Sequence, residues 1–154
     1  MRGVFVGEWR ILVFICVWCG LLMVVRDGHA AGMQEMVGTW YAEVRENNSF
    51  NGKRYTIRRQ VELNRPDGTK VVTFRHYDRD RMVGEMIITY TWGAANDVYW
   101  AVCQTEVNDG RVRPCDWRTE YDILSVDGQT LRYKSRSSGT VYNHKRVGDN
   151  FRLP

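Results

Sequence analysis

The sequence predicts an all-β protein, an eight-stranded antiparallel up-and-down barrel that follows an N-terminal signal segment. Eight segments after the first thirty residues alternate polar and apolar side chains with the period of two that is typical of strands. No segment beyond residue 30 keeps a helical period. The connections are short, so each strand should run antiparallel to the one before it, and eight such strands can close into a small barrel.

Tight-turn residues separate the candidate strands. Asn51-Gly52, Asn108-Asp109-Gly110 and Asp127-Gly128 are strong hairpin signals, because these residues tolerate positive φ angles. A two-sheet sandwich is the alternative, but it usually needs longer crossover connections than any in this chain. The strands are expected at residues 37–45, 53–64, 69–78, 82–92, 97–106, 112–124, 129–136 and 139–147.

The first thirty residues have the pattern of an export signal. Arg2 and Arg10 give a positive start, residues 11–25 are an unbroken apolar run, and the small residue Ala30 suits cleavage. An apolar run of this length is shorter than the roughly 20 residues that cross a bilayer, although an uncleaved anchor is the alternative. We therefore predict a periplasmic or secreted protein whose mature form has no stable membrane span.

Length and charge limit the organisation of the chain and its partners. A chain of 154 residues with 44% hydrophobic residues suits one domain, predicted over residues 31–154. The net charge is +4, and the 22 Lys and Arg residues are spread along the chain instead of gathering on one element. Nucleic-acid binding usually needs such a basic cluster with aromatic residues between, so we predict no nucleic-acid partner.

Two of the four cysteines, Cys103 and Cys115, lie in the mature part. A pair of cysteines in an oxidising compartment most often forms a disulfide. A three-residue loop centred on Asp109 would place residue 103 opposite residue 115 on paired strands. The bridge should stabilise the fold by about 2 to 3 kcal/mol.

Alternation predicts which side chains point into the barrel. In residues 112–124 the apolar and aromatic side chains share one face and the charged ones the other. The same argument turns Ile57, Val61 and Leu63 inward, and Arg59 with them. An inward arginine is a candidate for binding a carboxylate or phosphate. The predicted ligand-binding side chains are Tyr55, Arg59, Tyr90, Trp92, Trp117, Tyr121 and Tyr133.

Two strands leave alternatives open. In residues 69–78, either Val71, Thr73 and Arg75 or the alternating set that contains His76 could face inward. In residues 97–106, an inward Cys103 turns Trp100 outward. Such a tryptophan either marks a partner surface or is covered by a terminal segment such as residues 150–154.

The run Gly38-Thr39-Trp40, which opens an eight-stranded barrel in an exported chain, resembles the G-x-W motif of the lipocalins and the wider calycin group. With Tyr41 it is also similar to the first strand of avidin-type biotin binders. The resemblance implies a structural role for Gly38 and Trp40, in which the tryptophan closes the barrel floor. It also implies that Arg146, near the last strand, packs across that tryptophan.

Two functions follow as hypotheses. The first is a noncatalytic binding protein that holds a small hydrophobic or aromatic anionic ligand inside the barrel. The second is a protein-interaction module of the cell envelope with a filled barrel, which acts through its outer surface near Trp100. An enzyme of lipocalin-like fold ranks third, because the chain has no nucleophile motif and no glycine-rich phosphate loop.

No cofactor or metal site is predicted. His76 and Asp78 share one strand face, and His144 lies on the last strand. These two strands are not neighbours in an up-and-down barrel, so a metal would have to be held across the lumen.

Overall fold

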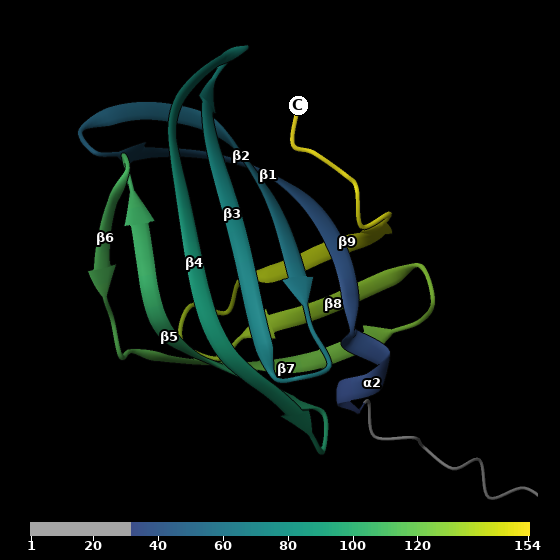
Figure 1. Ribbon diagram of the computed structural model, residues 1–154. Helices are drawn as coiled ribbons and strands as arrows, with labels where there is room; N and C mark the ends of the chain where they lie inside the picture. The colour runs from purple at the N-terminus through teal and green to yellow at the C-terminus, as the bar shows by residue number, and fades with distance from the viewer. Residues whose placement is uncertain (1–31) are drawn as a thin grey trace, which may run out of the picture.

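The computed structural model describes residues 32–154, so the signal segment predicted over residues 1–30 lies outside the described residues. A short helix precedes nine strands (Figure 1). The elements are α2 (Met33–Met36), β1 (Gly38–Phe50), β2 (Lys53–Asn64), β3 (Thr69–Asp78), β4 (Arg81–Ala95), β5 (Val98–Asn108), β6 (Arg111–Pro114), β7 (Arg118–Val126), β8 (Thr130–Ser135) and β9 (Val141–Val147).

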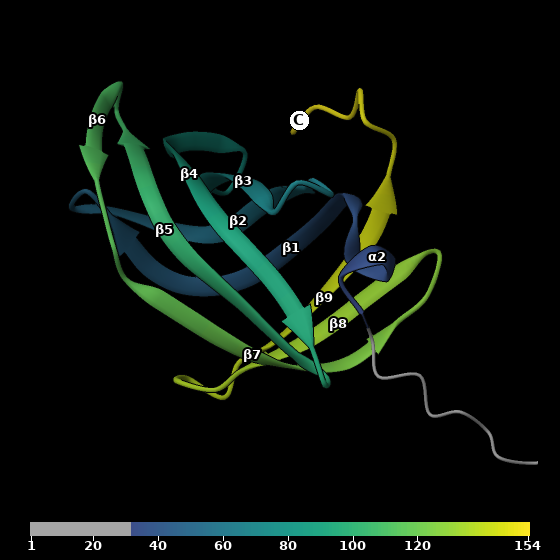
Figure 2. The same ribbon diagram turned by 60° about the horizontal axis from the view of Figure 1, so that its bottom comes forward.

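The strands form a closed antiparallel barrel, as the sequence predicted. The hydrogen-bonded order is β4-β3-β2-β1-β9-β8-β7-β5, and β4 also pairs with β5, which closes the ring. Both β6 and β7 pair with β5, one beside each half of it, so together they fill one position of an eight-stranded barrel (Figure 2). Closure removes the exposed edges that an open sheet would present.

The sixth position departs from the continuous strand expected over residues 112–124. The strand pairing stops after Pro114, whose ring nitrogen has no N–H to donate, and resumes at Arg118. The preceding turn is also shorter than predicted, because Asn108 pairs directly with Arg111 and leaves a two-residue turn. Asp109 and Gly110 both have positive φ angles, 48° and 75°, as the tightest hairpin turns require.

Cys103 and Cys115 are joined by a disulfide across this irregular segment. Cys103 is fully buried in the core, and Cys115 packs against the core from the chain between β6 and β7. The backbone N–H of Cys115 donates to the carbonyl of Gln104 over 3.2 Å. The bridge therefore fixes the segment between β6 and β7 to β5, together with this hydrogen bond and the one from the backbone N–H of Cys103 to the carbonyl of Trp117 at 2.9 Å.

Trp40 fills the closed end of the barrel. It is fully buried, and its indole Nε1 donates to the carbonyl of Met36 in α2 over 2.8 Å. The guanidinium carbon of Arg146 lies 4.2 Å from the centroid of the Trp40 ring, a cation–π distance. Helix α2 and Arg146 thus cover the two sides of this tryptophan.

Gly38 makes room for this arrangement. Its φ angle is 131°, which residues with a side chain rarely adopt, and an added Cβ would lie 2.3 Å from Nη1 of Arg146. The same Nη1 donates to the carbonyl of Val37 over 2.9 Å. A larger residue at position 38 would push the arginine off the tryptophan.

The β1–β2 hairpin bends over the opposite end. The β1–β2 pairing is irregular between Arg45 and Asn48, and beyond that point the ring of Phe50 stacks on His76 with centroids 4.2 Å apart. Nδ2 of Asn51 donates to side-chain oxygens of Asn108 and Asp109 in the β5–β6 turn, both at 2.8 Å. This end of the barrel is therefore partly covered by its own hairpin.

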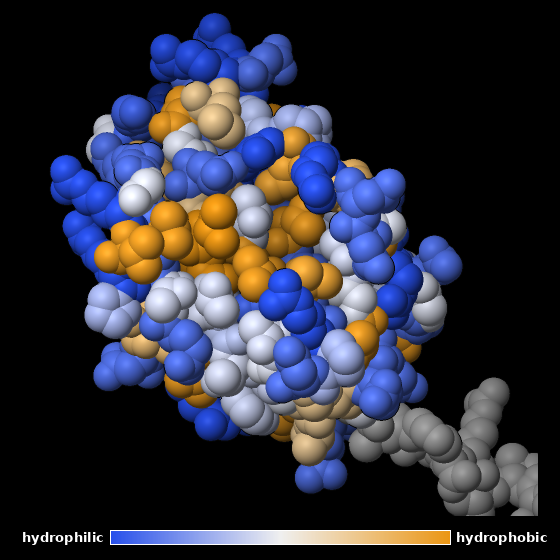
Figure 3. Space-filling model, viewed as in Figure 1, coloured by the Kyte–Doolittle hydropathy of each residue, from blue (hydrophilic) through white to orange (hydrophobic). Residues whose placement is uncertain are grey.

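The prediction of which β2 side chains point inward is wrong. Gln60 and Glu62 point into the barrel and are buried, while Val61 and Leu63 lie on the outer face. The outer face is apolar there because the C-terminal segment packs beside it: Leu153 is only 8% exposed. Figure 3 shows the resulting apolar patch over β3 and β4.

In the neighbouring strand β3, the sequence left two orientations open, and the structure shows the one in which His76 points inward. Val72, Phe74 and His76 line the interior, whereas Val71, Thr73 and Arg75 line the outer groove. Among residues 32–154, no helix is long and apolar enough to cross a membrane.

Candidate functional site

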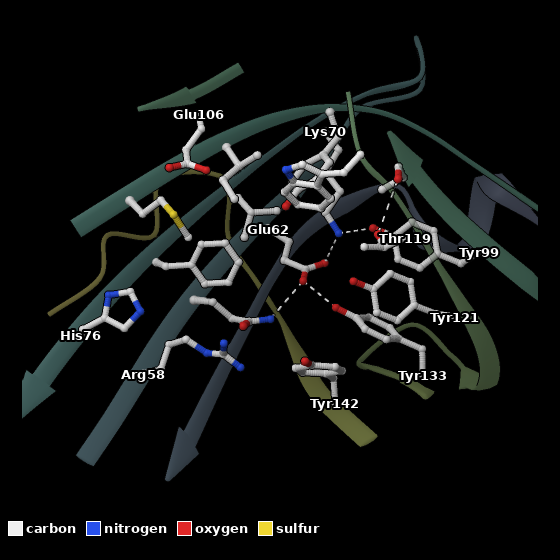
Figure 4. Close-up of a pocket in the computed structure, with 18 residues that line it drawn as sticks. Arg58, Glu62, Lys70, His76, Tyr99, Glu106, Thr119, Tyr121, Tyr133 and Tyr142 are labelled. Carbon is white, nitrogen blue, oxygen red and sulfur yellow. Dashed lines mark hydrogen bonds and ion pairs between the residues drawn. The ribbon is translucent and has the colours of Figure 1, made fainter. Parts of the chain in front are cut away.

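The barrel encloses a cavity of about 270 Å³. Its walls combine aromatic rings with polar and charged side chains (Figure 4). Aromatic rings come from β4, β5, the segment between β6 and β7, and β7, β8 and β9: Tyr90, Tyr99, Trp117, Tyr121, Tyr133 and Tyr142. This volume is slightly below the range of about 300 to 1,000 Å³ that is usual for small-molecule sites.

The tyrosines form a continuous cluster. The ring of Tyr121 lies 5.1 Å from Tyr99 and 4.9 Å from Tyr133, and Tyr133 lies 5.3 Å from Tyr142. These separations fall within the favourable range for aromatic pairs. Burial raises the pKa of Tyr121, so its hydroxyl stays neutral at physiological pH. The cluster therefore offers neutral ring faces and edges to a bound molecule.

A charged pair, Glu62 and Lys70, lies at the floor of the cavity. Nζ of Lys70 is 2.6 Å from Oε2 of Glu62, and both side chains are at most 4% exposed. The Lys70 ammonium also donates to the hydroxyl of Tyr99, and the hydroxyl of Tyr133 donates to Oε1 of Glu62 over 2.6 Å. Two buried charges survive here because each has a partner of opposite sign and further hydrogen bonds.

This network holds Glu62 as a carboxylate. Burial by itself would raise the pKa of Glu62, but the Lys70 charge and the contacts with His144 and Lys70 outweigh it and lower the pKa. Nε2 of Gln60 donates to Oε1 of Glu62 over 3.0 Å and lies 2.8 Å from Nε2 of His144. Glu62 therefore accepts hydrogen bonds from three neighbours and has little capacity to bind a ligand itself.

Arg58 and His76 line the cavity toward the covered end. The guanidinium of Arg58 lies 5.7 Å from the centroid of Phe74, and its Nε is 3.4 Å from Oε1 of Glu46. No hydrogen bond joins that guanidinium to any residue of the described part, 32–154. Burial, followed by the nearby charge of Arg58, lowers the pKa of His76, so this imidazole is neutral at pH 7.

Four of the predicted ligand-binding residues meet in the cavity wall. Tyr90, Trp117, Tyr121 and Tyr133 all line it. The rings of Tyr90 and Trp117 lie 5.5 Å apart, nearly perpendicular. Trp117 is 41% exposed, so it is the cavity aromatic with the most open access to solvent.

The other predicted ligand-binding residues lie elsewhere. Trp92 is buried at the closed end, where its indole Nε1 donates to the carbonyls of Arg65 and Thr69 at 3.2 and 3.1 Å. Tyr55 lies under the bent hairpin, 4.6 Å from the ring of His76. Its hydroxyl donates to Glu46, and burial together with this bond raises the pKa of Tyr55 to about 12.

Arg59 does not point inward, which corrects the expectation from the sequence. Its Nε lies 3.1 Å from Oε2 of Glu43, its register partner on β1, and its guanidinium lies 4.7 Å from the centroid of Tyr77. The odd-numbered residues of this part of β2 face outward, so the neighbouring arginine, Arg58, is the one that reaches the cavity.

The polar half of the site was missed from the sequence. Gln60, Glu62 and Lys70 belong to the polar faces of their strands, and a polar face was read as solvent-exposed. One signal could have revealed this pair. The β2–β3 hairpin register pairs Glu62 with Val72, which makes Lys70 the diagonal neighbour of Glu62. Opposite charges at diagonal positions on one face of a sheet attract each other.

No group of three His, Cys, Asp or Glu residues within 32–154 is placed to hold a metal ion. The chain matches no protein-family model, and no curated protein has a significantly similar sequence. Fold and site therefore define the class of protein: a closed antiparallel β-barrel with a cavity lined by aromatic and charged side chains.

Proposed function

We propose that this protein is an exported, noncatalytic binding protein that holds a small hydrophobic or aromatic ligand with an anionic group inside its barrel. The interior cavity of about 270 Å³ supports this function, because it would accept a molecule of one or two rings. Its tyrosine cluster offers stacking surfaces. The disulfide is compatible with an oxidising compartment, periplasmic or extracellular.

Arg58 is the observation that carries the anionic part of the proposal. A half-buried guanidinium has five N–H donors, and leaving them without acceptors is costly. The carboxylate of Glu46 forms an ion pair with its Nε at 3.4 Å, but it accepts no hydrogen bond from the guanidinium and leaves the other N–H donors open to a ligand. A ligand carboxylate, sulfonate or phosphate could take up the free donors in a bidentate contact.

The geometry of the closed end supports a lipocalin-like origin of the barrel. Trp40 at the floor, Gly38 before it and Arg146 across the ring occupy the places that the G-x-W resemblance implies. We include a lipocalin-like origin in the proposal, but a shared fold does not indicate which ligand is bound.

A surface-acting interaction module of the cell envelope is the second candidate function. Trp100 lies on the outer face of β5, where it packs closely on Gly93 and lies 5.2 Å from the guanidinium of Arg118. This cover leaves only part of the ring open to a partner. The interior cavity favours the first function over this one.

Calorimetric titration of the purified protein with 2-naphthoate, an aromatic carboxylate, tests the proposal. We expect saturable binding that Arg58→Ala weakens by about 10- to 100-fold, the range for a lost charged hydrogen bond. Arg59→Ala is the matched control, an arginine one residue away on the outer face, and should change affinity less than twofold. Equal effects of both variants, or no binding, would contradict the proposal.

A further inference from the structure

Glu106 is a carboxylate in the cavity wall without a partner of its own. It lies on β5, half-buried, at the position that pairs with Ile88 on β4 and Arg113 on β6. Its side chain makes no hydrogen bond and no ion pair with any residue from 32 to 154. The other cavity charges differ, because Lys70 is bound to Glu62 and Arg58 lies near Glu46.

Two aromatic rings lie on the same side of the cavity as Glu106. Tyr90 is two residues along β4 from Ile88, the register partner of Glu106, so its side chain faces the same interior. Burial is the main cause that raises the pKa of Tyr90; Tyr121, Glu62 and Glu106 raise it further. Trp117 meets Tyr90 edge to face at 5.5 Å.

A carboxylate that lines the same cavity as a tyrosine and a tryptophan is an arrangement that can recognise organic cations. Ring faces attract an ammonium group through their quadrupole, and a carboxylate adds a full opposite charge. Trp117 is 41% exposed in the gap between β6 and β7, so a ligand group can approach from that side. Arg113, the register partner of Glu106 on β6, is exposed and makes no ion pair with Glu106 within the described residues.

We infer that Glu106, Tyr90 and Trp117 form a subsite for a primary or quaternary ammonium group. The inference rests on the proposed function, because both subsites belong to one cavity. Arg58 on β2 and Glu106 on β5 are separated by three strand spacings, about 14 Å around the barrel, and by four residues along the strands, about 13 Å. The ligand therefore carries its positive and negative groups on opposite ends of an aromatic body.

Titration with benzyltrimethylammonium, by calorimetry or by tryptophan fluorescence, tests the subsite directly. The wild-type protein, purified after expression of the full chain, should bind it saturably. Glu106→Gln should weaken binding at least fivefold, while Arg113→Gln leaves it unchanged or tightens it. Trp117→Ala should also weaken binding, and Trp117→Phe should restore part of it, because an aromatic face is retained.

A parallel titration with 2-naphthoate separates the two proposals. If 2-naphthoate binds and benzyltrimethylammonium does not, or if Glu106→Gln leaves cation affinity unchanged, the cation subsite is overturned and the proposed function stands. If neither compound binds the wild-type protein, the proposed function fails as well. Circular dichroism spectra that match the wild type show that each variant is folded.

Discussion

The inner and outer faces of β2 and β3 are built in opposite ways. The inner face carries Glu62 and Lys70, two ionised side chains that are almost completely buried. The outer face carries Val61, Leu63 and Val71, which are partly exposed. In most half-buried strands the polar side chains face solvent, so these strands reverse the usual pattern.

The reversal has a physical basis on each face. Inside, Glu62 receives hydrogen bonds from Lys70, Gln60 and Tyr133, which offset the cost of taking its charge out of water. Outside, the C-terminal residues cover part of the apolar surface: Arg75 donates to the carbonyl of Leu153, and Tyr77 donates to that of Pro154. Buried charge thus marks the interior as more than a packed core, and the predictions below test each face.

The largest effect is expected inside the barrel. Glu62→Gln leaves the Lys70 ammonium buried without its counter-charge, so the free energy of unfolding should fall by about 3 to 5 kcal/mol. Chemical denaturation measures this loss. Glu43→Gln, which removes the outer-face partner of Arg59, is the control and should cost less than about 1 kcal/mol. Similar losses in both variants would show that the inner pair has no special role.

The second-largest effect is expected from acid, which should lower the free energy of unfolding through the inner face. The pKa of Glu62 is lowered in the folded protein, so its contribution to stability is complete above the unfolded value of about 4.3 and is lost as pH falls toward the folded value. Unfolding curves between pH 7 and pH 3 should show this decline. The double variant Glu62→Met/Lys70→Met lacks the titrating pair and should show a flatter profile; an equally steep one would contradict this assignment.

Substitutions on the outer face should lower the free energy of unfolding by less. Leu153→Ala removes an apolar side chain that is 8% exposed and should cost about 1 to 2 kcal/mol. Leu124→Ala, at a position that is 46% exposed, is the matched control and should change the free energy of unfolding by less than about 0.5 kcal/mol. Thermal unfolding compares the two variants. Equal shifts would mean that the C-terminal segment does not cover the outer face.

The same comparison explains how far the sequence predicts this molecule. Turn residues such as Asn51-Gly52 and the alternation along each strand are local signals, and they were enough to predict the closed eight-stranded barrel. Tyr121 and Tyr133 were also placed correctly in the interior, because their strands carry charges on the opposite face. The strand break after Pro114 was not predicted, since a proline can also mark a bulge.

The inward face of β2 could not be predicted from local pattern. Its orientation depends on partners far away in the sequence: Tyr133 bonds Glu62 from 71 positions later, and the outer residues are covered by the chain end near Leu153. Hydrophobic alternation assumes that the barrel interior is apolar. Here the interior is the more polar face of the strand, so the assumption selected Arg59 instead of Arg58.

The central claim is that ligands bind inside the barrel and not on its surface. Two tryptophans report on the two locations: Trp117 lines the cavity, and Trp100 lies on the outer face against Gly93. In ¹⁵N–¹H NMR spectra recorded during a titration with 2-naphthoate, the Trp117 indole N–H signal should shift to saturation at the calorimetric Kd while that of Trp100 stays in place. A shifting Trp100 signal beside an unchanged Trp117 signal would contradict the account.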